Sequence, residues 1–385
     1  MLTLGIDRLL QGDTARWRKM RAGLLANPTS QTGDLTPGVD ALRAHPDVNL
    51  VALFGPEHGV RGDAQAGAHV ADERDAATGL PVHSLYGATR KPTPEMLERL
   101  DVIFVDLQDA GVRFFTYPYT LAYVMEAAAT CNVQVVVLDR PNPIGGDRVE
   151  GNVLDMAFRS FVGRYPLALR HGMTLGELAT WMNRVGNLGC ALDVVDMEGW
   201  QRSQWYDETG CFWSQPGPNV PTLDTLTVYP GTCLIEGTNV SEGRGTTRPF
   251  EWIGAPWINP RALLWAMRDH ALPGTAFRQI AFTPTFSKYQ GQPCQGIQIY
   301  VTDRERFAPV QVGLTLIRTI RALHPAHFRW IHERPDEPLF FDLLMGTDRV
   351  RRRIEDGVPT DTLCRDFQAQ REAFMRQRME HLRYD

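Results

Sequence analysis

The sequence predicts an α/β protein of two domains: a Rossmann-like, doubly wound domain over residues 1–226 and a smaller α/β or α+β domain over residues 227–385. Three observations lead to this prediction. Four short segments in the first half are almost continuously apolar, which is typical of parallel strands buried on both faces. Helical patterns lie between them, in the βαβ order of a doubly wound sheet. With 385 residues, the chain also exceeds the size at which a single hydrophobic core usually stops growing.

The individual elements follow from local patterns. The expected strands of the first half are Arg21–Ala26, Asn49–Phe54, Asp101–Asp106 and Val133–Asp139. Helices are expected at Pro94–Leu100 and Tyr119–Thr130, and a third begins after Thr174, because Glu177 completes a capping box with it. The segment Ser214–Thr225, rich in Pro, Gly and Asn, is expected to be an ordered loop near the domain boundary. The second domain should contain a strand at Gln298–Val301, a helix at Val310–Leu323 and a helical, charged C-terminal end.

Composition limits the partners. The net charge of −5 and the pI of about 6.1 argue against nucleic-acid or anionic-membrane binding, which requires a basic surface. No signal peptide is apparent at the N-terminus, and no segment approaches the roughly 18 apolar residues of a membrane span. The six Cys residues are scattered without a C-x-x-C pair, as expected of reduced thiols. We therefore expect a cytoplasmic protein, whose oligomeric state the sequence does not determine.

Cofactor motifs are absent from the sequence. No G-x-G-x-x-G follows the first strand and no P-loop occurs, so a nucleotide cofactor is not expected. His58, His69, His83 and His171 do not form H-E-x-x-H or another close ligand spacing, so no metal is expected either. A G-x-S-x-G elbow for serine catalysis is also missing.

Polar loops follow the expected strands, and ligands of doubly wound sheets bind beyond these carboxyl ends. The loop at residues 54–63 places Glu57 beside His58 between glycines, with Arg61 shortly after. A carboxyl group beside an imidazole is a candidate general acid, because its surroundings can tune its pKa. The alternative is a surface turn whose charges are solvated.

The loop after the third expected strand, residues 106–117, has the mixture of groups that binds sugars. It contains two carboxylates, an amide, a guanidinium and a phenol: Asp106, Gln108, Asp109, Arg113 and Tyr117. Arg113 could instead pair with Asp109 and only fix the loop. In the loop after the fourth strand, Arg140 and Asn142 are similar candidates, while Asp139 could cap or clamp the chain.

A third cluster occupies residues 236–251, where polar side chains alternate with glycines. Its candidates are Glu236, Asn239, Glu242, Arg244 and Thr246. Arg244 has the planar geometry to clamp a carboxylate, and backbone amides among the glycines could form an anion-binding nest. The alternative is a glycine-rich loop without function. Asn219, from the loop before this domain, is a further substrate-binding candidate.

Long strings in the sequence together resemble one family. They are LFGPEHGVRGDAQAG, LYGATRKPTPEML, DLQDAGVRFFTYPYT, VVLDRPNPIGG, RHGMTLGELA, GPNVPTLDT, VYPGTCLIEGTNVSEGRGTTRPFE, GAPWI and FSKYQGQPCQGIQIYVTD. They follow in order from about residue 20 to about residue 350. The chain resembles the NamZ family, formerly a domain of unknown function.

This resemblance implies an exo-β-N-acetylmuramidase that releases N-acetylmuramic acid from the non-reducing ends of peptidoglycan fragments. It implies a Rossmann-like N-terminal domain, a smaller C-terminal domain and an active site between them. The family's catalytic glutamate lies in the P-E-H-G string, which corresponds to Glu57. Many relatives carry a signal peptide that this chain lacks, which favours a role in recycling of muropeptides.

The chemistry of the candidate residues agrees with this resemblance. Glycoside cleavage needs an acid to protonate the leaving oxygen and a second group for the oxocarbenium centre, which can be the substrate's own N-acetyl group. The catalytic candidates are Glu57, His58, Asp106, Asp109 and Glu242. The lactyl carboxylate of N-acetylmuramic acid calls for an arginine, with Arg61, Arg113, Arg140 and Arg244 available.

Two other classes of function stay open from sequence. A non-catalytic sugar-binding protein also has two α/β domains around a cleft. A metal-dependent esterase or amidase could use Glu57, His58 and Asp106.

Overall fold

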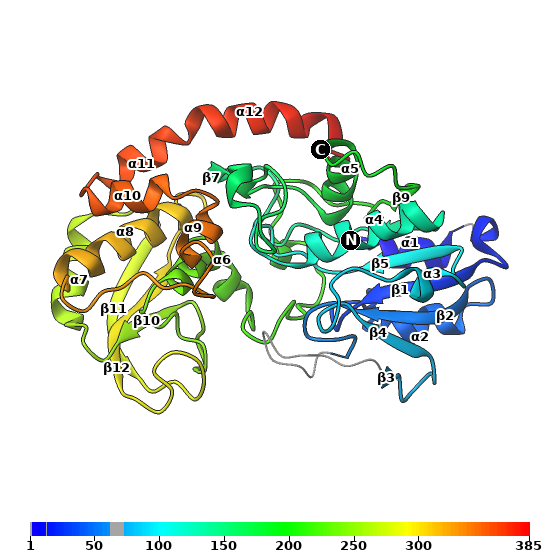
Figure 1. Ribbon diagram of the computed structural model, residues 1–385, viewed down its shortest axis with the longest axis horizontal. Coiled ribbons are helices and arrows are strands. Elements are labelled where there is room, and N and C mark those ends of the chain that lie inside the picture. Colours follow the sequence, from blue (N-terminus) through cyan, green and yellow to red (C-terminus); the bar gives the residue numbers. More distant parts are fainter. Residues whose placement is uncertain (1, 13, 62–72) are drawn as a thin grey trace.

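A seven-stranded sheet forms the centre of the N-terminal domain, and the order of its strands places the site. The computed structural model describes residues 2–12, 14–61 and 73–385 (Figure 1). The strand order is β3-β4-β2-β1-β5-β6-β9. The strands are β1 (Arg21–Ala26), β2 (Asn49–Gly55), β3 (Glu73–Arg74), β4 (Pro81–Ser84), β5 (Val102–Asp106), β6 (Gln134–Leu138) and β9 (Leu192–Val195). All pairs are parallel except β3 with β4.

Without the antiparallel edge strand β3, this order is the 3-2-1-4-5-6 arrangement of a Rossmann fold. The chain turns from one half of the sheet to the other between β1 and β5, so the loops after these neighbouring strands diverge and leave a crevice. The predicted fold class is therefore confirmed. Residues 62–72, which include His69 and the end of the loop at residues 54–63, lie outside the described residues.

Both faces of the sheet are covered, which explains the continuous apolar strands. Neighbouring residues such as Leu24 and Leu25 belong to separate hydrophobic clusters, because successive side chains of a strand point to opposite faces. One face packs against α1 (Gly5–Gln11) and α2 (Gly38–Ala44). The other packs against α3 (Pro94–Leu97), α4 (Tyr117–Cys131) and α5 (Leu175–Val185). The sheet is thus doubly wound.

Most expected elements lie close to their predicted positions. The four strands agree to within one residue at each end, and α4 begins two residues earlier than expected. The predicted capping box of α5 is present: the Thr174 hydroxyl accepts from the Glu177 amide, and the Glu177 carboxylate accepts from the Thr174 amide. Residues 214–222 form a loop, as expected. The strands β4 and β9 were not predicted, because each has only four residues.

The C-terminal domain is built on an antiparallel sheet of order β10-β12-β11. Its strands are β10 (Trp252–Ala255), β11 (Thr275–Phe282) and β12 (Cys294–Val301), and its helices are α6 (Leu223–Thr232), α7 (Pro260–Asp269), α8 (Pro309–Leu323), α9 (Phe340–Met345), α10 (Arg349–Glu355) and α11 (Thr360–Asp366). This agrees with a smaller α+β domain. The predicted boundary at residue 226 falls inside α6, which packs on α8.

Shorter elements complete the fold. They are the hairpin of β7 (Glu150–Val153) and β8 (Ala168–Arg170) and the 3-10 helices η1 (Ala15–Trp17), η2 (Met156–Phe158), η3 (Tyr206–Glu208), η4 (Cys233–Gly237) and η5 (Met379–His381). No helix in the described part of the chain has the length and apolar character needed to cross a membrane.

The last helix, α12 (Gln368–Arg378), returns the chain from the C-terminal domain to the N-terminal domain (Figure 1). The Arg378 guanidinium donates to the carbonyl oxygens of His171 and Gly172, at 2.9 and 2.7 Å. Beyond it, the Tyr384 hydroxyl donates to the buried Asp139 carboxylate at 2.6 Å. The two domains are therefore joined at α6 and again by this returning segment.

Arg113 makes a third connection between the domains, inside the core. Its guanidinium donates to the carbonyl oxygens of Asn152 and Leu167 in the N-terminal domain, at 2.8 and 2.9 Å. It also donates to those of Leu344 and Met345 in the C-terminal domain, at 3.1 and 2.7 Å. The side chain is fully buried, and this burial lowers its pKa to about 10. Arg113 thus holds α9 against the hairpin β7–β8.

We predict that Arg113→Met destabilises the protein strongly. Methionine removes this donor from four carbonyl oxygens, of which those of Leu167 and Met345 keep a second donor. Each buried group that is left unsatisfied costs about 1–3 kcal/mol. Urea unfolding should show a lower free energy of unfolding, or two transitions in place of one, as the domains uncouple. Arg99→Met, at an exposed side chain that pairs with its neighbour Glu98, is the control. Equal unfolding curves for the two variants would contradict this role.

Asp139 leads to a prediction about pH. Burial raises the pKa of Asp139 to about 6, although Tyr384, Thr174 and Gly176 donate hydrogen bonds to its carboxylate. The folded pKa then exceeds the unfolded value of about 3.9, so the proton is held more tightly in the folded state. The contribution of Asp139 to stability is complete below about pH 4 and is lost as the pH rises through about 6.

Asp139→Asn cannot ionise. As the pH rises from about 4 to about 7, the free energy of unfolding of the wild type should therefore fall relative to that of the variant, by up to about 3 kcal/mol. Urea titrations across this range measure it. Parallel stability profiles of the two proteins would show that Asp139 does not titrate there.

Candidate active site

A cleft of about 850 Å³ lies between the two domains. Its N-terminal wall comes from the loops after β2, β4 and β5, at the carboxyl edge of the sheet, and from residues 157–162 between β7 and β8. Its C-terminal wall comes from η4 and from two segments, residues 242–250 and 286–288, with residues 331–344 at the rim. The predicted location of the active site, between the domains, coincides with this cleft.

Glu57 lies on the N-terminal wall, directly after β2. Its carboxylate accepts a hydrogen bond from the Thr116 hydroxyl at 3.0 Å, and Tyr86 is a second hydrogen-bond partner. Burial, followed by the negative charge of Glu57, raises the pKa of Tyr86 to about 12. Tyr86 is therefore a neutral hydrogen-bond partner at ordinary pH. The carboxyl group of Glu57 is held in one position at the mouth of the crevice.

His58 follows in a strained conformation. Its φ of +76° is rare for a residue other than glycine, and such backbone strain occurs mainly at functional sites. A Cβ atom on Gly217 would lie only 3.1 Å from the His58 Nε2 atom. The glycine of the 214–222 loop therefore makes room for the imidazole, and the turn directs Glu57 and His58 into the cleft.

The C-terminal wall carries a group of four alternating charges. Arg244 Nε lies 2.6 Å from Glu236 Oε1 and 3.5 Å from Glu242 Oε1. Lys288 Nζ lies 3.0 Å from Glu242 Oε2 and also donates to the carbonyl oxygens of Ile235, Glu236 and Val240. Burial raises the pKa of Glu236, whereas the positive charge of Arg244 opposes this shift. Two carboxylates and two cations neutralise this wall.

Local backbone geometry positions this group. Lys288 stands between Ser287 and Tyr289, whose φ angles of +68° and +58° place both in the left-handed region. Gly245 has a φ of +77°, and a Cβ atom there would lie 2.6 Å from the backbone nitrogen of Phe286. The loop that carries Arg244 therefore packs directly against the segment that carries Lys288, and only a glycine permits this contact.

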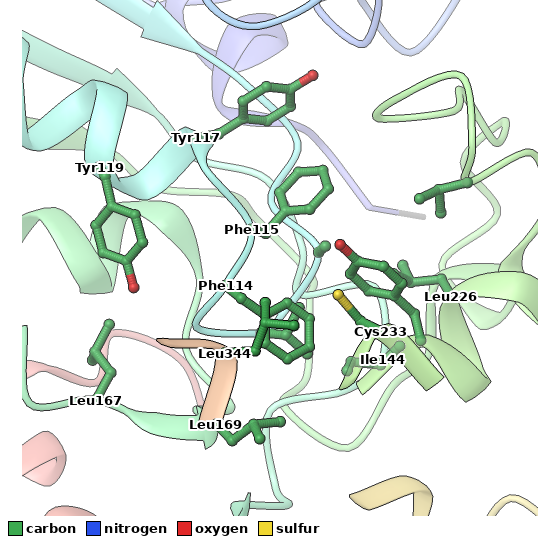
Figure 2. Close-up of a cluster of buried hydrophobic side chains, with 14 of the residues drawn as sticks. Phe114, Phe115, Tyr117, Tyr119, Ile144, Leu167, Leu169, Leu226, Cys233 and Leu344 are labelled. Atoms are coloured by element: carbon green, nitrogen blue, oxygen red, sulfur yellow. The ribbon is translucent and has the colours of Figure 1, made fainter. Parts of the chain in front are cut away.

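Aromatic rings form the floor of the cleft. Figure 2 shows Phe114, Phe115 and Tyr117 along the loop between β5 and α4. Tyr229 of α6 packs edge-on against Phe114 at 5.3 Å and against Phe250 at 4.6 Å between ring centroids. The Tyr117 hydroxyl donates to the carbonyl oxygen of Pro216. Both domains thus contribute to one rigid apolar surface, beside which charged groups act in a low dielectric.

Asn219 adds a polar group that the fold does not use. Only 7% of the residue is exposed, and it lines the cleft. Its Nδ2 atom is buried and has no hydrogen-bond partner in the described part of the protein. A buried donor without a partner is costly, so this amide is suited to a ligand or to bound water.

The structure brings part of the predicted site together. The residues that line the cleft are Glu57, His58, Tyr117, Asn219, Glu236, Glu242 and Arg244. They come from the loops after β2 and β5, the loop before α6 and the cluster at residues 236–251, which are far apart in the sequence. The cleft unites them.

Other predicted residues serve the fold, which corrects the expectation that all would face the substrate. Asp106 and Arg140 form a buried ion pair, with 2.5 Å from Nε to Oδ1 and 2.8 Å from Nη2 to Oδ2. Ser30 donates to the same carboxylate at 2.6 Å. Arg113 joins the domains, as described above, and does not pair with Asp109. Each of these charged side chains is bonded to partners inside the protein, because a charge without any partner in the core is strongly unfavourable.

Three more predicted residues belong to a buried polar network. Gln108 donates to the carbonyl oxygens of Asp109 and Pro141, and Asp109 accepts from the Gly111 amide at 2.8 Å. Asn142 bridges the amide of Ile144 and the carbonyl oxygen of Met173. The side chains of this network stiffen the carboxyl edge of the sheet instead of lining the cleft.

Arg61, Asn239 and Thr246 also lie outside the cleft lining. Arg61 pairs in bidentate fashion with Asp75, at 2.8 and 3.0 Å. Asn239 bridges the segment at residues 327–329, and the Thr246 hydroxyl donates to the carbonyl oxygen of Gly243. The bonds of these three side chains stabilise the loops that carry them.

The residues proposed for metal-dependent chemistry are not assembled. Asp106 is bound by Arg140 and Ser30, not placed beside Glu57 and His58 in the cleft. Within residues 2–12, 14–61 and 73–385, no three His, Cys, Asp or Glu side chains gather as a set of metal ligands. The three side chains proposed as the site of a metal-dependent esterase or amidase are therefore not brought together.

Sequence reasoning missed several residues of the cleft. They are Tyr86, Arg90, Thr116, Phe161 and Lys288. Tyr86 and Arg90 occur in the string LYGATRK, and Lys288 occurs in FSKYQG, so the strings that carry the family resemblance contained them. Phe161 lies in none of these strings.

Comparisons with known proteins agree with this architecture. Residues 22–224 match the family model described as "Exo-beta-N-acetylmuramidase NamZ, N-terminal", and residues 227–384 match the corresponding C-terminal model. A protein of Bacillus subtilis (strain 168) named "Peptidoglycan beta-N-acetylmuramidase NamZ" is 47% identical over 380 residues, which is 99% of this chain and 91% of the relative.

Two solved structures from Bacteroides fragilis NCTC 9343, both described as DUF1343 family proteins, share the whole fold. One is 36% identical with a TM-score of 0.90, and the other is 29% identical with a TM-score of 0.78. Each comparison covers 100% of this chain and 99% of the other. With both family models matched along the chain, this protein belongs to the NamZ family of exo-β-N-acetylmuramidases.

Proposed function

We propose that this glycoside hydrolase releases N-acetylmuramic acid from the non-reducing ends of peptidoglycan fragments, with Glu57 as the general acid. The observation that carries the proposal is the position of Glu57 at the mouth of the interdomain cleft, opposite a wall that contains two further carboxylates. Glycoside hydrolysis canonically needs two acidic groups, one on each side of the scissile bond. The match to the Bacillus subtilis muramidase supports the choice of substrate.

The surroundings of Glu57 suit proton donation. Thr116 and the neutral Tyr86 fix the carboxyl group by hydrogen bonds. Glu57 can therefore carry a proton to the leaving oxygen and take one back from water in the second half of the reaction.

The C-terminal wall supplies the complementary charge. Glu242, which forms ion pairs with Arg244 and Lys288, is the second carboxylate of this proposal and serves to stabilise the positive charge that develops at the sugar ring. The Asn219 amide is an unused donor for a hydroxyl or N-acetyl oxygen of the sugar. The aromatic floor excludes water beneath the ring.

Replacement of Glu57 tests the proposal directly. Glu57→Gln keeps the shape and the hydrogen bonds of the side chain but removes the acidic proton. Turnover of a muramic acid–glucosamine disaccharide should fall by roughly 10²–10⁴-fold, the usual contribution of a general acid. Glu98→Gln, at an exposed side chain, is the matched control. Release of N-acetylmuramic acid is measured by chromatography without added metal.

If folded wild-type protein releases no sugar at any pH, the assignment as a muramidase fails. If the wild type is active and Glu57→Gln is equally active, the acid lies elsewhere, and Glu242 becomes the first alternative.

Arg244 gives a second prediction. Because it already pairs with Glu236 and Glu242, we expect Arg244→Met to lower kcat and leave the preference for muramides over glucosaminides intact. Loss of the guanidinium leaves two neighbouring carboxylates with Lys288 alone, so one of them takes up a proton. A charge-assisted bond contributes about 1.5–3 kcal/mol, so kcat should fall roughly tenfold to a hundredfold.

Kinetics of Arg244→Met on both kinds of substrate, across pH, measure this effect. A variant with normal kcat that has lost only its selectivity would instead identify Arg244 as the residue that binds the lactyl carboxylate.

A further inference from the structure

Most cations of the cleft are already paired with carboxylates. Arg244 lies between Glu236 and Glu242, and Lys288 binds Glu242 and three carbonyl oxygens. Arg334, at the rim, lies 3.3 Å from Glu337. A substrate carboxylate at any of these positions would compete with a carboxylate of the protein. The residue that recognises an anionic substrate should be a cation without such a partner.

Arg90 meets this condition. It belongs to the loop after β4 and lines the cleft on the N-terminal wall. Among the residues that the structure describes, no carboxylate lies within ion-pair distance of its guanidinium, and no hydrogen bond engages it. Its Cζ atom instead lies 3.9 Å from the ring centroid of Phe161 and 5.7 Å from that of Tyr86.

Stacked aromatic rings hold Arg90 in place. Phe161 stacks on Tyr123, with 6.3 Å between ring centroids and an angle of 19°. Tyr123 in turn lies 4.3 Å from the Arg164 guanidinium, which pairs with Glu126 at 2.6 Å. A guanidinium on an aromatic face keeps its donors free at the edge, where they can bind a planar carboxylate in bidentate fashion. At one end of this stack, Glu126 neutralises the charge of Arg164. At the other end, the positive charge of Arg90 remains.

Arg90 also lies on the same side of the cleft as the proposed general acid. Tyr86 is the link: its hydroxyl is a partner of Glu57, and its ring lies beneath the Arg90 guanidinium. A sugar whose glycosidic oxygen faces Glu57 therefore has its other substituents within the neighbourhood of Arg90. Arg159 lies on the same rim without an ion pair among the described residues, but no ring holds it, so binding through Arg159 would cost more conformational entropy.

We propose that Arg90 binds the lactyl carboxylate of N-acetylmuramic acid and thereby selects this sugar over N-acetylglucosamine. The inference rests on the proposed muramidase function and names the residue that determines its specificity. The two sugars differ chiefly in the lactyl ether, so a residue that recognises its charge separates them most strongly. The preorganised guanidinium loses little freedom on binding.

Binding measurements test this separately from turnover. Calorimetry compares N-acetylmuramic acid, its methyl ester and N-acetylglucosamine on the wild type, Arg90→Met, Arg90→Lys, Arg159→Met and the surface control Arg99→Met. The wild type and Arg99→Met should bind the free acid roughly tenfold to a hundredfold more tightly than the ester. Arg90→Met should lose this preference, and Arg90→Lys should regain part of it, because lysine restores the charge but not the planar geometry.

A second comparison identifies the source of the carboxylate. In N-acetylmuramyl-L-alanine the lactyl group is an amide, and the carboxylate lies one residue further out. The wild type should bind this compound more weakly than the free acid, by a factor similar to that for the ester. If it binds both equally well through Arg90, the residue recognises a peptide carboxylate and the lactyl assignment is wrong.

The remaining outcomes are also distinct. If Arg90→Met keeps the full preference for the free acid, or if only Arg159→Met loses it, the assignment to Arg90 is overturned. If the wild type prefers the free acid in calorimetry but releases no sugar from the disaccharide, the muramidase proposal fails while the carboxylate site stands. Thermal unfolding should be unchanged in each variant, since Arg90 is exposed.

Discussion

The buried guanidinium of Arg113 fixes the distance between the two domains, and the cleft depends on it. A cation in the core, without a carboxylate partner, needs other hydrogen-bond acceptors, and here carbonyl oxygens from both domains accept from its two terminal nitrogens. Separation of the domains would expose these donors and break the shared aromatic packing of Phe114 and Tyr229 at once. The walls that carry Glu57 and Glu242 are therefore held at one separation, as positioned catalytic groups require.

Paired charges also stiffen the carboxyl edge of the N-terminal sheet. Asp106 and Arg140 form a buried ion pair at the ends of β5 and β6, and Asp139 receives hydrogen bonds from α5 and from Tyr384 near the C-terminus. A buried ion pair is costly to desolvate and adds little net stability, but loss of one partner would leave an unpaired charge. Its role here is geometric, because Ser30 also donates to Asp106 and Arg140 donates to the Gln31 carbonyl oxygen, so that the loops after β1 and β5, on either side of the switch point, are fixed together.

Sequence patterns predicted the fold well because they reflect burial. The continuous apolar character of β1, β5 and β6 follows from a sheet covered on both faces, and the capping box of α5 is a local interaction of four residues. They predicted the site less well, because its assembly is not local. Arg113 and Arg140 resembled ligand-binding arginines in composition, yet their partners lie in segments far away in sequence. Lys288 and Tyr86 come from strings that carried the family resemblance, but only the fold places them beside Glu242 and Glu57.

The ion pairs among the charged side chains of the cleft, more than its amino-acid composition, determine how it can act. The two walls differ in charge: the C-terminal wall is nearly neutral, since Arg244 and Lys288 balance Glu236 and Glu242. The N-terminal wall combines Glu57, which accepts a hydrogen bond from Thr116, with the Arg90 guanidinium, which is held by aromatic rings. An anionic sugar therefore meets, on the N-terminal wall, a guanidinium that has no carboxylate partner among the described residues, and this asymmetry orients the sugar before any bond is broken. Because the acid belongs to the wall that attracts the anion, recognition of the substituent and protonation of the leaving oxygen are coupled by position.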